Sequence, residues 1–570
     1  KTYDDPTIKD VALEGTFKVK WKDMPEVECK TGFQMVKDNA KKYKPEDAEK
    51  ICEVPAATIR RITKEFVDAA QIGSTIVLDG QEYRYRPAAY SYSKSYSGSR
   101  GWMTQAAMKL VNVLIGNTNS PGGWGDFEAD LTANPADGCM TIHDFKYTHV
   151  KFPPEFPGLS FDSRTGGGGM YPMTYNLNGL AWFAMNDPQK YWLQHPAEIY
   201  AFNGANLMGN SYSPEFISQQ IKKIPFVWGT PYHFDDIAEL ADVLLPNDTH
   251  LDGNLQSFPV GPYCHTEPPT TTGAWFQHPV VDRVYNTKNA DDILIELAAR
   301  IGILNGKGGF NDKMNRNIKD KYKLDLNKQY TWAEVSDRLR QSEFGDGIGN
   351  QWFTENGYKI TGSEGWKGLY PDMKWPDSRY RVYVEDLVWA RNEWGKDLAK
   401  LKAEKGVELR PSNEFVVNYM QPLPTWTPRP YESLPAEYDM YAVHYKTMLH
   451  SMTTFMDNPW ISDFIQSFDP YTMSIMINPD TAAKKGVKTG DQITVESPFG
   501  KVTGEAAVTE LIRPDTVAIA GCMGATSPDL NPVARDGVLF NRLCWGDETW
   551  RDPFTGNQEN SMKVKVYKKV

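Results

Sequence analysis

From Tyr438 onward the sequence alternates short apolar runs with turns, and this alternation constrains the fold more than any other feature. The apolar runs are TMSIMINP, DQITVESPFG, KVTGEAAVTE and DTVAIAG. Gly486 is placed to cap a short helix, Gly490-Asp491 leads into a strand and Phe499-Gly500 turns a hairpin. Short strands separated by such turns are typical of small barrels, so we expect a six-stranded β-barrel here.

A second pattern, in which strands alternate with helices, occupies residues 197–246. The run AEIYAFNGAN predicts a strand and a turn, SPEFISQQIKK predicts an amphipathic helix, and IPFVWGTPY and ADVLLP predict two more strands. This alternation favours a parallel sheet, in which ligands bind at the carboxyl ends of the strands. A further helix is predicted at 290–302, with these residues facing inward: Ile293, Leu294, Leu297 and Ile301.

The amino-terminal part reads as helices over residues 31–70, a strand at 74–79, and a helix that ends near Gly116. The fold class is therefore α/β and multidomain, with parallel-sheet α/β units followed by the carboxy-terminal barrel. We predict four parts: a helical and α/β part at 1–125, an α/β unit with a loop insertion at 126–304, an irregular helical insertion and proline-rich linker at 305–435, and the barrel at 436–570.

Charge and hydropathy exclude several kinds of partner. The chain has 570 residues, a formal net charge of -11 and a pI of about 5.5, which argues against nucleic acid or an anionic membrane as the main partner. The sequence contains no run of about 18 apolar residues, so no transmembrane helix is predicted. It opens at Lys1 with neither an initiator methionine nor a signal peptide, as expected of a processed, split or incomplete chain.

Simple catalytic and metal motifs are missing from the sequence. It has no P-loop, GxGxxG, HExxH or GxSxG pattern, and the glycines at 166–169 are more typical of a loop than of a phosphate cradle. The cysteines have no CxxC or cluster spacing, so mostly buried free thiols are expected. The six are Cys29, Cys52, Cys139, Cys264, Cys522 and Cys544.

The carboxy-terminal part resembles the molydopterin dinucleotide-binding domain that closes the large subunits of the dimethyl sulfoxide reductase superfamily. The matching segments are His450-Ser451, INPDTAAKKGVKTGDQITVESPFGKV, IRPDTVAIAG and FNRLCWGDETWRDPFTG. The pattern NP..A...G...GD.I.V.S..G.V within them is specific over that length. The alternative is a generic six-stranded barrel that shares these turns.

The central part resembles the same superfamily. FNGANLMGN is similar to the family's G.NP turn after a sheet strand, and IPFVWGTPYHFDDIAELADVLLP is similar to its D.F..ETA..ADVVLP signature. Leu207 departs from the usual proline, and Asp236-Ile237 departs from the frequent Glu-Thr. The turn at 203–206 offers backbone N–H groups and side-chain amides at a strand end, where a phosphate or guanine would fit.

The amino-terminal part completes the family order. YKPEDAEKICEVPAATIRRITKEF, followed by a strand, a helix and LIGNTNSPGG, resembles the family's approach to the substrate funnel. Residues 8–16, 82–88 and 419–431 resemble the branch that includes phenylacetyl-CoA:acceptor oxidoreductase-like and thiosulfate or polysulfide reductase-like subunits.

The resemblance implies a set of cofactor-binding residues. Gly204, Asn206 and Thr230 are expected near a nucleotide end, across the cofactor from the barrel. His450, Ser451 and Asn541 are expected near one pterin dinucleotide, with Asp242 and Gln558 as further contacts. A strand-end cap is an equally good interpretation of Asp242. Histidines near the expected funnel are candidate proton carriers, although each is more often structural or exposed: His143, His149, His233 and His265.

The resemblance also implies a function. The chain is expected to be the carboxy-terminal two-thirds of a molybdopterin-dependent oxidoreductase large subunit, with a molybdenum or tungsten bis(molybdopterin guanine dinucleotide) cofactor. It would catalyse oxygen-atom transfer or hydroxylation and dehydrogenation. A 4Fe-4S cluster and the metal ligand would come from an amino-terminal segment or a separate chain, so no metal ligand is expected here. Electrons would pass to a ferredoxin-like iron–sulfur subunit, in an assembly that can include a membrane anchor subunit.

Two other functions remain open at this point. A hydratase or transhydroxylase would use the same cofactor without net redox change. A cofactor-free subunit would serve only as a scaffold for electron transfer. Metal analysis separates the scaffold from the two enzymes, and an artificial electron acceptor separates the oxidoreductase from the hydratase.

Overall fold

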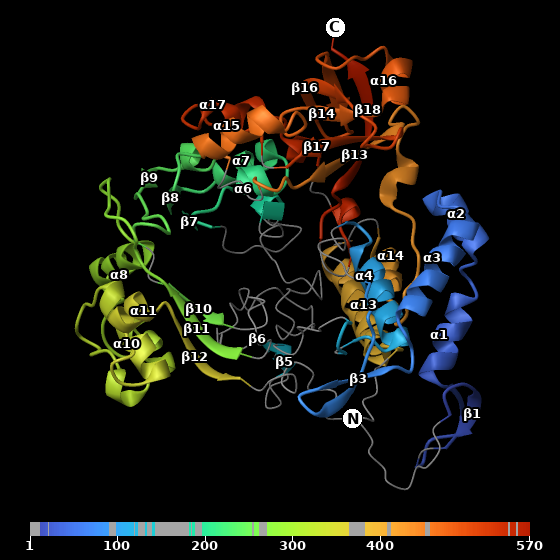
Figure 1. Ribbon diagram of the computed structural model, residues 1–570, viewed down its shortest axis with the longest axis horizontal. Coiled ribbons are helices and arrows are strands. Elements are labelled where there is room, and N and C mark those ends of the chain that lie inside the picture. The colour runs from blue at the N-terminus through green and yellow to red at the C-terminus, as the bar shows by residue number, and fades with distance from the viewer. Residues whose placement is uncertain are drawn as a thin grey trace. The chain divides into compact units, whose positions relative to one another are not determined.

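The computed structural model divides the chain into two compact units, each built from several segments (Figure 1). The amino-terminal unit contains Lys1–Gln194, Leu369–Leu434 and Gly546–Asn560, and the barrel unit contains His195–Gly368, Pro435–Trp545 and Ser561–Val570. The structure describes residues 12–20, 22–90, 98–118, 120–123, 131–133, 140–142, 182–183, 185–187, 197–253, 256–260, 271–363, 382–406, 408, 412–450, 456–521, 523–544, 548–553 and 557–569.

The closed β-barrel predicted from the sequence is confirmed in the barrel unit. Its strands are β13 (Met440–Tyr445), β14 (Ile475–Ile477), β15 (Gln492–Glu496), β16 (Lys501–Val508), β17 (Thr516–Ala520) and β18 (Ser561–Lys568). They close in the order β13-β17-β14-β16-β15-β18. The interior is filled by fully buried aliphatic side chains, as in other small barrels. Among them are Ile475, Ile477, Ile493, Val495 and Ile519.

Three helices accompany the barrel strands: α15 (Pro459–Phe468), α16 (Pro479–Lys485) and α17 (Pro532–Asp536). Asn478 caps α16 by accepting a hydrogen bond from the Asp480 backbone N–H, and Gly486 ends it with a φ of 66°. A left-handed backbone of this kind is most easily adopted by glycine, which explains why the sequence pattern located the end of this helix.

The three-stranded parallel sheet is also confirmed. β7 (Ile199–Asn203), β8 (Phe226–Thr230) and β9 (Val243–Leu244) pair in that order and in parallel. The helices α6 (Leu207–Asn210) and α7 (Pro214–Ile221) connect β7 to β8. Ile217 and Ile221 on α7 are completely buried, so the apolar face of this helix lies in the core.

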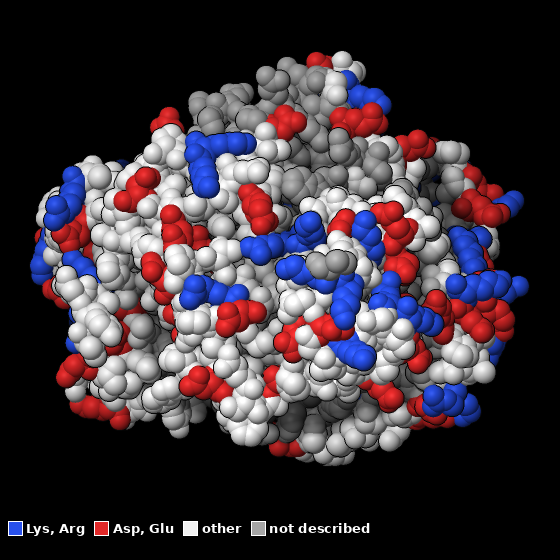
Figure 2. Space-filling model, turned by 90° about the horizontal axis from the view of Figure 1, so that it is seen from above, with Lys and Arg blue, Asp and Glu red and all other residues white. Residues whose placement is uncertain are grey.

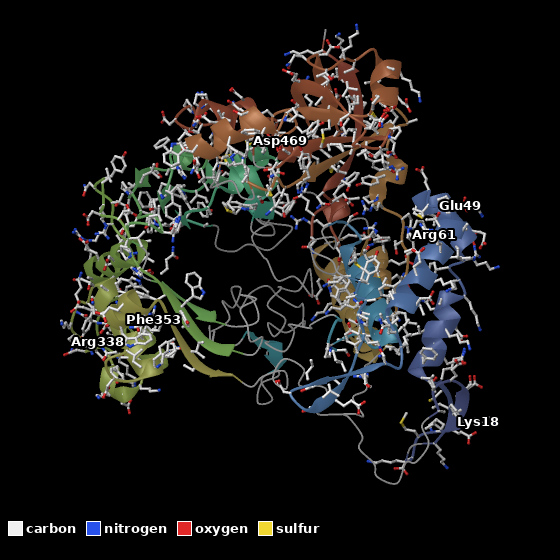
Figure 3. All side chains as sticks on the ribbon, viewed as in Figure 1. Lys18, Glu49, Arg61, Arg338, Phe353 and Asp469 are labelled. Carbon is white, nitrogen blue, oxygen red and sulfur yellow. The ribbon has the colours of Figure 1, made fainter. Side chains whose placement is uncertain are left out.

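The rest of the barrel unit consists of an antiparallel sheet and a helical cluster. The sheet contains β10 (Gln256–Val260), β11 (Thr271–Gln277) and β12 (Tyr358–Ser363). The helices are α8 (Ala290–Arg300), α9 (Phe310–Met314), α10 (Trp332–Phe344) and α11 (Asn350–Asn356). Phe353 of α11 is fully buried against Phe276 and Phe344 (Figure 3), which packs this helix against β11.

The predicted helix at 290–302 is present, but its predicted inward face is partly wrong. Ile293 is buried as expected, whereas Leu294 is 45% exposed and Ile301 is 66% exposed. The buried face instead runs through Ile295 and Ala298, which join a core cluster with side chains from residues 304–335. The inward direction is therefore set by that later segment, which the helix's own periodicity does not reveal.

The described part of the amino-terminal unit contains more helix than strand. Its helices are α1 (Gly32–Ala40), α2 (Pro45–Cys52), α3 (Ala56–Ala69), α4 (Gly101–Ile115), α13 (Glu385–Lys405) and α14 (Asn413–Tyr419). Three two-stranded sheets join β1 (Thr16–Val19) to β2 (Val27–Lys30), β3 (Thr75–Leu78) to β4 (Gln81–Arg84), and β5 (Leu131–Ala133) to β6 (Met140–Ile142). Asp79 and Gly80 both have positive φ, as required by the tight turn between β3 and β4.

Two surface properties bear on possible partners. Among the described helices, none has both the length and the apolar character needed to cross a membrane. Figure 2 shows lysine and arginine side chains interspersed with aspartate and glutamate on the face that it presents.

Residues 546–560 follow the barrel strands β13 to β17 in sequence but belong to the amino-terminal unit, where they supply two buried acids. The Asp552 carboxylate is completely buried and accepts hydrogen bonds from the Trp102 backbone N–H at 2.9 Å and the Tyr419 hydroxyl at 2.7 Å. Trp102 lies in the first turn of α4, whose own N-cap residue makes no side-chain cap. A carboxylate is favourable there because the N-terminus of a helix is electropositive.

The second buried acid, Glu559, binds the residues just before α4. Its carboxylate accepts hydrogen bonds from the Ser99 backbone N–H at 3.1 Å and the Ser99 hydroxyl at 2.6 Å. Arg429 lies 3.2 Å away and supplies a positive charge. Buried carboxylates are tolerated only when paired in this way, so Glu559 fixes the approach to the helix.

We predict that Asp552→Ala destabilises the amino-terminal unit by roughly 3 kcal/mol or more, because it leaves two buried donors without an acceptor. Tyr419→Phe removes only one donor and should have a smaller effect, about 1 kcal/mol. Hydrogen exchange measured by mass spectrometry should show faster exchange in the first turn of α4 in Asp552→Ala. Unchanged exchange there would contradict the capping role.

Candidate cofactor-binding site

The carboxyl ends of β7 and β8 lie side by side and carry three of the predicted residues: Gly204 and Asn206 after β7, and Thr230 at the end of β8. Gly204 follows β7 with a φ of 57°, and its backbone N–H donates to the carbonyl of Thr230 at 3.3 Å. The Thr230 hydroxyl donates to the Asn203 side-chain oxygen at 3.0 Å. A Cβ at Gly204 would lie 2.7 Å from the ring of Tyr232, so the close approach of this ring also requires glycine.

Asn206 and Asp236 join this turn to the barrel segment. The Asn206 side chain accepts from the Gly209 backbone N–H and donates to the Asp236 carboxylate at 2.9 Å. The other Asp236 oxygen accepts from the Thr526 N–H at 2.5 Å, the Thr526 hydroxyl at 2.6 Å and the Ser527 N–H at 2.9 Å. Asp236 is 4% exposed, so a single buried carboxylate holds the strand-end loop against the loop before α17.

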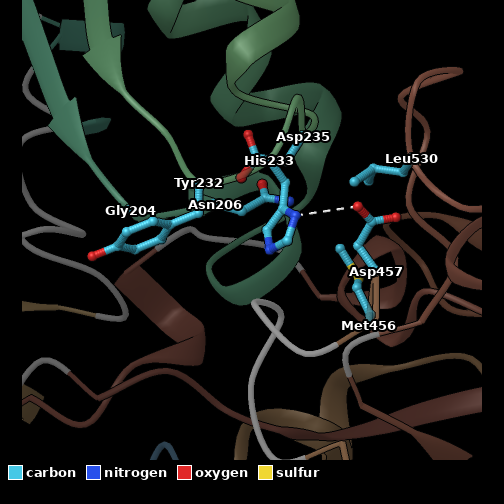
Figure 4. A pocket seen from close by; sticks show the side chains of 8 residues that line it. All are labelled: Gly204, Asn206, Tyr232, His233, Asp235, Met456, Asp457 and Leu530. Atoms are coloured by element: carbon cyan, nitrogen blue, oxygen red, sulfur yellow. Dashed lines mark ion pairs between the residues drawn. The ribbon is translucent and has the colours of Figure 1, made fainter. Parts of the chain in front are cut away.

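A pocket lies at this junction, and Figure 4 shows side chains from both sides of it. It is lined by Gly204, Asn206, Tyr232, His233, Asp235, Met456, Asp457 and Leu530. The His233 Nδ1 atom is 3.2 Å from the Asp457 carboxylate, a contact between the loop after β8 and the residues before α15. The pocket therefore offers hydrogen-bonding groups from both the sheet and the barrel segments.

Asp235 is the unusual acid of this pocket. Burial raises the pKa of its carboxyl to about 7, and the negative charge of the neighbouring Asp236 acts in the same direction. The hydrogen bond donated by the Ala238 N–H acts in the opposite direction and lowers this pKa. At neutral pH this carboxyl is divided between its protonated and charged forms. It can therefore both donate and accept hydrogen bonds.

His450 is completely buried in the segment after β13. Its backbone N–H donates to the Thr447 hydroxyl, but within the described part of the chain neither ring nitrogen has a hydrogen-bond partner. Burial lowers the pKa of the imidazole, so the ring is neutral at pH 7 with one donor and one acceptor. Buried polar atoms without partners are rare and costly, so a bound polar group is the expected partner of this side chain.

Of the other predicted residues, Asn541 lies at the junction, whereas Asp242 and Gln558 lie elsewhere. Asn541, in a short 3-10 helix (Phe540–Leu543), donates to the Gly209 carbonyl at 3.2 Å, which brings it to the same junction. Asp242 accepts from the Val227 N–H at 2.7 Å, the geometry of a strand-end cap. Gln558 pairs with Arg551 in the amino-terminal unit. Four predicted residues lie outside the described ranges: Ser451, His143, His149 and His265.

The structure thus brings Gly204, Asn206, Thr230 and Asn541 to one junction in the barrel unit, and their cofactor contacts stay predictions. The roles of Asp235 and Asp457 in the pocket were not predicted, and Asp236 stood out in the sequence only as a departure from a family pattern. The signal available in the sequence was a pair of adjacent acids a few residues after the end of a sheet strand. No group of three or more metal-ligating side chains occurs among the residues that the structure describes.

Comparison with protein families identifies the barrel. Residues 440–559 match the family described as the Molydopterin dinucleotide binding domain. This match covers β13 to β17 and His450.

Two curated proteins match most of the chain. The first is the molybdopterin-containing subunit of thiosulfate reductase from Salmonella typhimurium, 22% identical over 523 residues, which cover 90% of this chain and 60% of that protein. The second is the molybdopterin-containing subunit of arsenate respiratory reductase from a Shewanella species (strain ANA-3), 22% identical over 516 residues, 84% of this chain and 54% of that protein. The chain thus spans less than two thirds of each relative.

A solved structure has a similar fold. Acetylene hydratase from Pelobacter acetylenicus superposes with a TM-score of 0.56 at 14% sequence identity, over 94% of this chain and 66% of that one. At this identity the similarity concerns the fold alone.

We predict that Asp236→Ala loosens the junction, because it leaves the N–H groups of Thr526 and Ser527 without their acceptor, at a cost of roughly 3 kcal/mol. Hydrogen exchange should accelerate in residues 523–531 and 204–210 and stay unchanged in α10, which lies outside the junction. If residues 523–531 and 204–210 exchanged at the same rates in the variant as in the wild type, Asp236 would not be what holds the two loops together.

The raised pKa of Asp235 predicts a stability that depends on pH. The folded protein binds the carboxyl proton more tightly than the unfolded chain, so this residue's contribution to stability falls as pH rises from about 4 to about 7. Asp235→Asn keeps the acceptor for Ala238 and has no charge to bury. The variant's melting temperature should therefore exceed that of the wild type, and the difference should be larger at pH 8 than at pH 5. A difference independent of pH would contradict the raised pKa.

Proposed function

This chain belongs to the dimethyl sulfoxide reductase superfamily, and we propose that it is part of the catalytic large subunit of an oxidoreductase that uses a molybdenum or tungsten bis(molybdopterin guanine dinucleotide) cofactor. The observation that carries the proposal is the match of the barrel to the dinucleotide binding domain. When bound, the metal centre would change oxidation state and supply oxygen-atom transfer or hydroxylation and dehydrogenation. The substrate of such a centre is set by groups around it.

The residues of the barrel unit fit such a cofactor. A pterin dinucleotide presents ring N–H groups and nitrogens, pyrophosphate oxygens and a guanine base, and it therefore needs both donors and acceptors. The neutral His450 ring has a donor and an acceptor without partners among the described residues. The junction pocket adds the amide of Asn206 and the carboxyl of Asp235.

The chain's own residues would bind and orient the cofactor. We assign the nucleotide end to Gly204, Asn206 and Thr230, and one pterin dinucleotide to His450, Ser451 and Asn541. The cofactor contact predicted for Gln558, which lies in the amino-terminal unit, stays a separate prediction. Asp242 is assigned to the end of the sheet, where its carboxylate already has a backbone partner. His233 is the candidate proton carrier of the described pocket, because Asp457 can accept from its ring.

The proposed function also needs groups that other segments or polypeptides would supply. Both relatives are molybdopterin-containing subunits of reductases, which supports an assembly of several polypeptides. We propose that a 4Fe-4S cluster and the metal ligand come from another segment or chain, and that electrons pass to a ferredoxin-like iron–sulfur subunit. A membrane anchor subunit would be a further partner.

We predict that the native complex contains molybdenum or tungsten and releases about two guanine nucleotides per copy of this chain on acid treatment. His450→Ala should lower the retained nucleotide, because the loss of hydrogen bonds worth about 1–3 kcal/mol weakens binding about 5- to 150-fold. His250→Ala, at an exposed position, is the control. An intact, folded complex without metal or nucleotide would refute the proposed function.

A hydratase is the second candidate, because the fold is similar to that of acetylene hydratase. The two candidates differ in electron flow: an oxidoreductase reduces an artificial electron acceptor when it turns over substrate, whereas a hydratase does not. Product formation without reduction of such an acceptor by the metal-loaded complex would favour the hydratase.

A further inference from the structure

Helix α15 exposes a stripe of aromatic side chains. Trp460 is 85% exposed, Phe464 is 51% exposed and Phe468 is 72% exposed. These residues are spaced by four along the helix and therefore lie on one face. The rings of Phe464 and Phe468 are 4.6 Å apart between centroids, so the stripe is continuous at this end.

The opposite face holds the helix firmly in the barrel unit. Ile465 is 2% exposed, Ser462 is fully buried, and the Ser462 hydroxyl donates to the Met456 carbonyl at 3.3 Å. At the start of the helix, Asn458 accepts from the N–H groups of Trp460 and Ile461. The aromatic stripe is therefore carried by a helix whose opposite side is already buried and hydrogen-bonded within the barrel unit.

The stripe has the size and composition of an interface core. A large aromatic side chain buries roughly 150–250 Å², so three of them supply a large part of the roughly 800 Å² that each partner contributes to a typical interface. Trp is among the residues most enriched at energetic centres of interfaces. Exposed apolar patches of this kind mark interaction sites on soluble proteins.

The charge around the stripe is negative. Residues 458–479, which include the whole helix, contain two aspartates and no lysine or arginine. Asp463 is exposed on the flank of the stripe, and Asp469 follows the end of the helix (Figure 3). The neighbouring helix α17 brings one exposed base and one exposed acid, Arg535 and Asp536, which offset each other.

We propose that Trp460, Phe464 and Phe468 form the docking surface for a different polypeptide, one that presents an apolar groove with lysine or arginine at its rim. A second copy of this chain fits less well, because two such stripes would bring like-charged aspartates together. The inference rests on the proposed function only in that this chain works in an assembly of several polypeptides.

The experiment uses the full chain, tagged and expressed in its native source. Phe464 is replaced by the photocrosslinking amino acid p-benzoylphenylalanine, and crosslinked peptides are identified by mass spectrometry after irradiation. In parallel, W460S/F464S/F468S and Asp463→Lys are compared with two control variants in an exposed loop of the same unit, Tyr285→Ser and Asp282→Lys. Melting temperatures verify that every variant is folded.

The proposal expects crosslinks to one other polypeptide, at an apolar segment with lysine or arginine within a few residues. The triple variant should lower the amount of that polypeptide that copurifies at least about tenfold, and Asp463→Lys should weaken binding most at low salt. The controls should have no effect. Crosslinks to a second copy, to lipid, to this chain itself or to nothing would each overturn the proposal.

Metal and guanine nucleotide are measured in the same preparations, which separates the two proposals. If both are present and the partner is lost only from the stripe variants, the docking surface and the function both stand. If the partner binds but metal and nucleotide are absent, only the proposed function fails.

Discussion

The buried carboxylate of Asp236 is the interaction on which the barrel unit depends. It accepts hydrogen bonds from the backbone N–H groups of Thr526 and Ser527, from the Thr526 hydroxyl and from the Asn206 side-chain amide. These partners come from segments about 290 residues apart in sequence, so one side chain offsets the entropy of bringing two distant loops together. Charge-assisted hydrogen bonds are short and strong, as the distances of 2.5–2.9 Å show. The pocket lies beside this contact, because Asn206 and Asp235 both line it.

Buried carboxylates also join distant segments of the chain in the amino-terminal unit. Asp552 and Glu559 lie on a segment that departs from the barrel chain, and their carboxylates accept from backbone and hydroxyl groups at the start of α4. Their partners are 450 and 460 residues earlier in the sequence. In both units a buried acid therefore joins remote segments, and a helix or loop that lacks its own cap receives one from elsewhere.

Local patterns in the sequence were sufficient for the barrel and for the sheet of β7, β8 and β9, whereas the strands β10, β11 and β12 were not predicted. Turns such as Gly490-Asp491 and the apolar runs between them follow from short-range chemistry, and so does the parallel order of β7 and β8. The inward face of α8 was not predictable, because Leu294 and Ile295 are equally apolar and the packing of residues 304–335 decides between them. The partners of Asp236 were equally hidden, since no local pattern pairs residues 236 and 526.

The two adjacent acids bear on the proposal that an anionic nucleotide binds at this strand end. The Asp236 charge is neutralised by four donors, so little of it faces the pocket. The pKa of Asp235 is raised by burial to about 7, so at neutral pH this carboxyl is protonated about half the time. A neutral carboxyl adds no repulsion to a pyrophosphate, and in either form it can pair with a base. Replacing the family's frequent glutamate by the shorter Asp236 is compatible with this arrangement, because the loop at Thr526 and Ser527 approaches close enough to reach it.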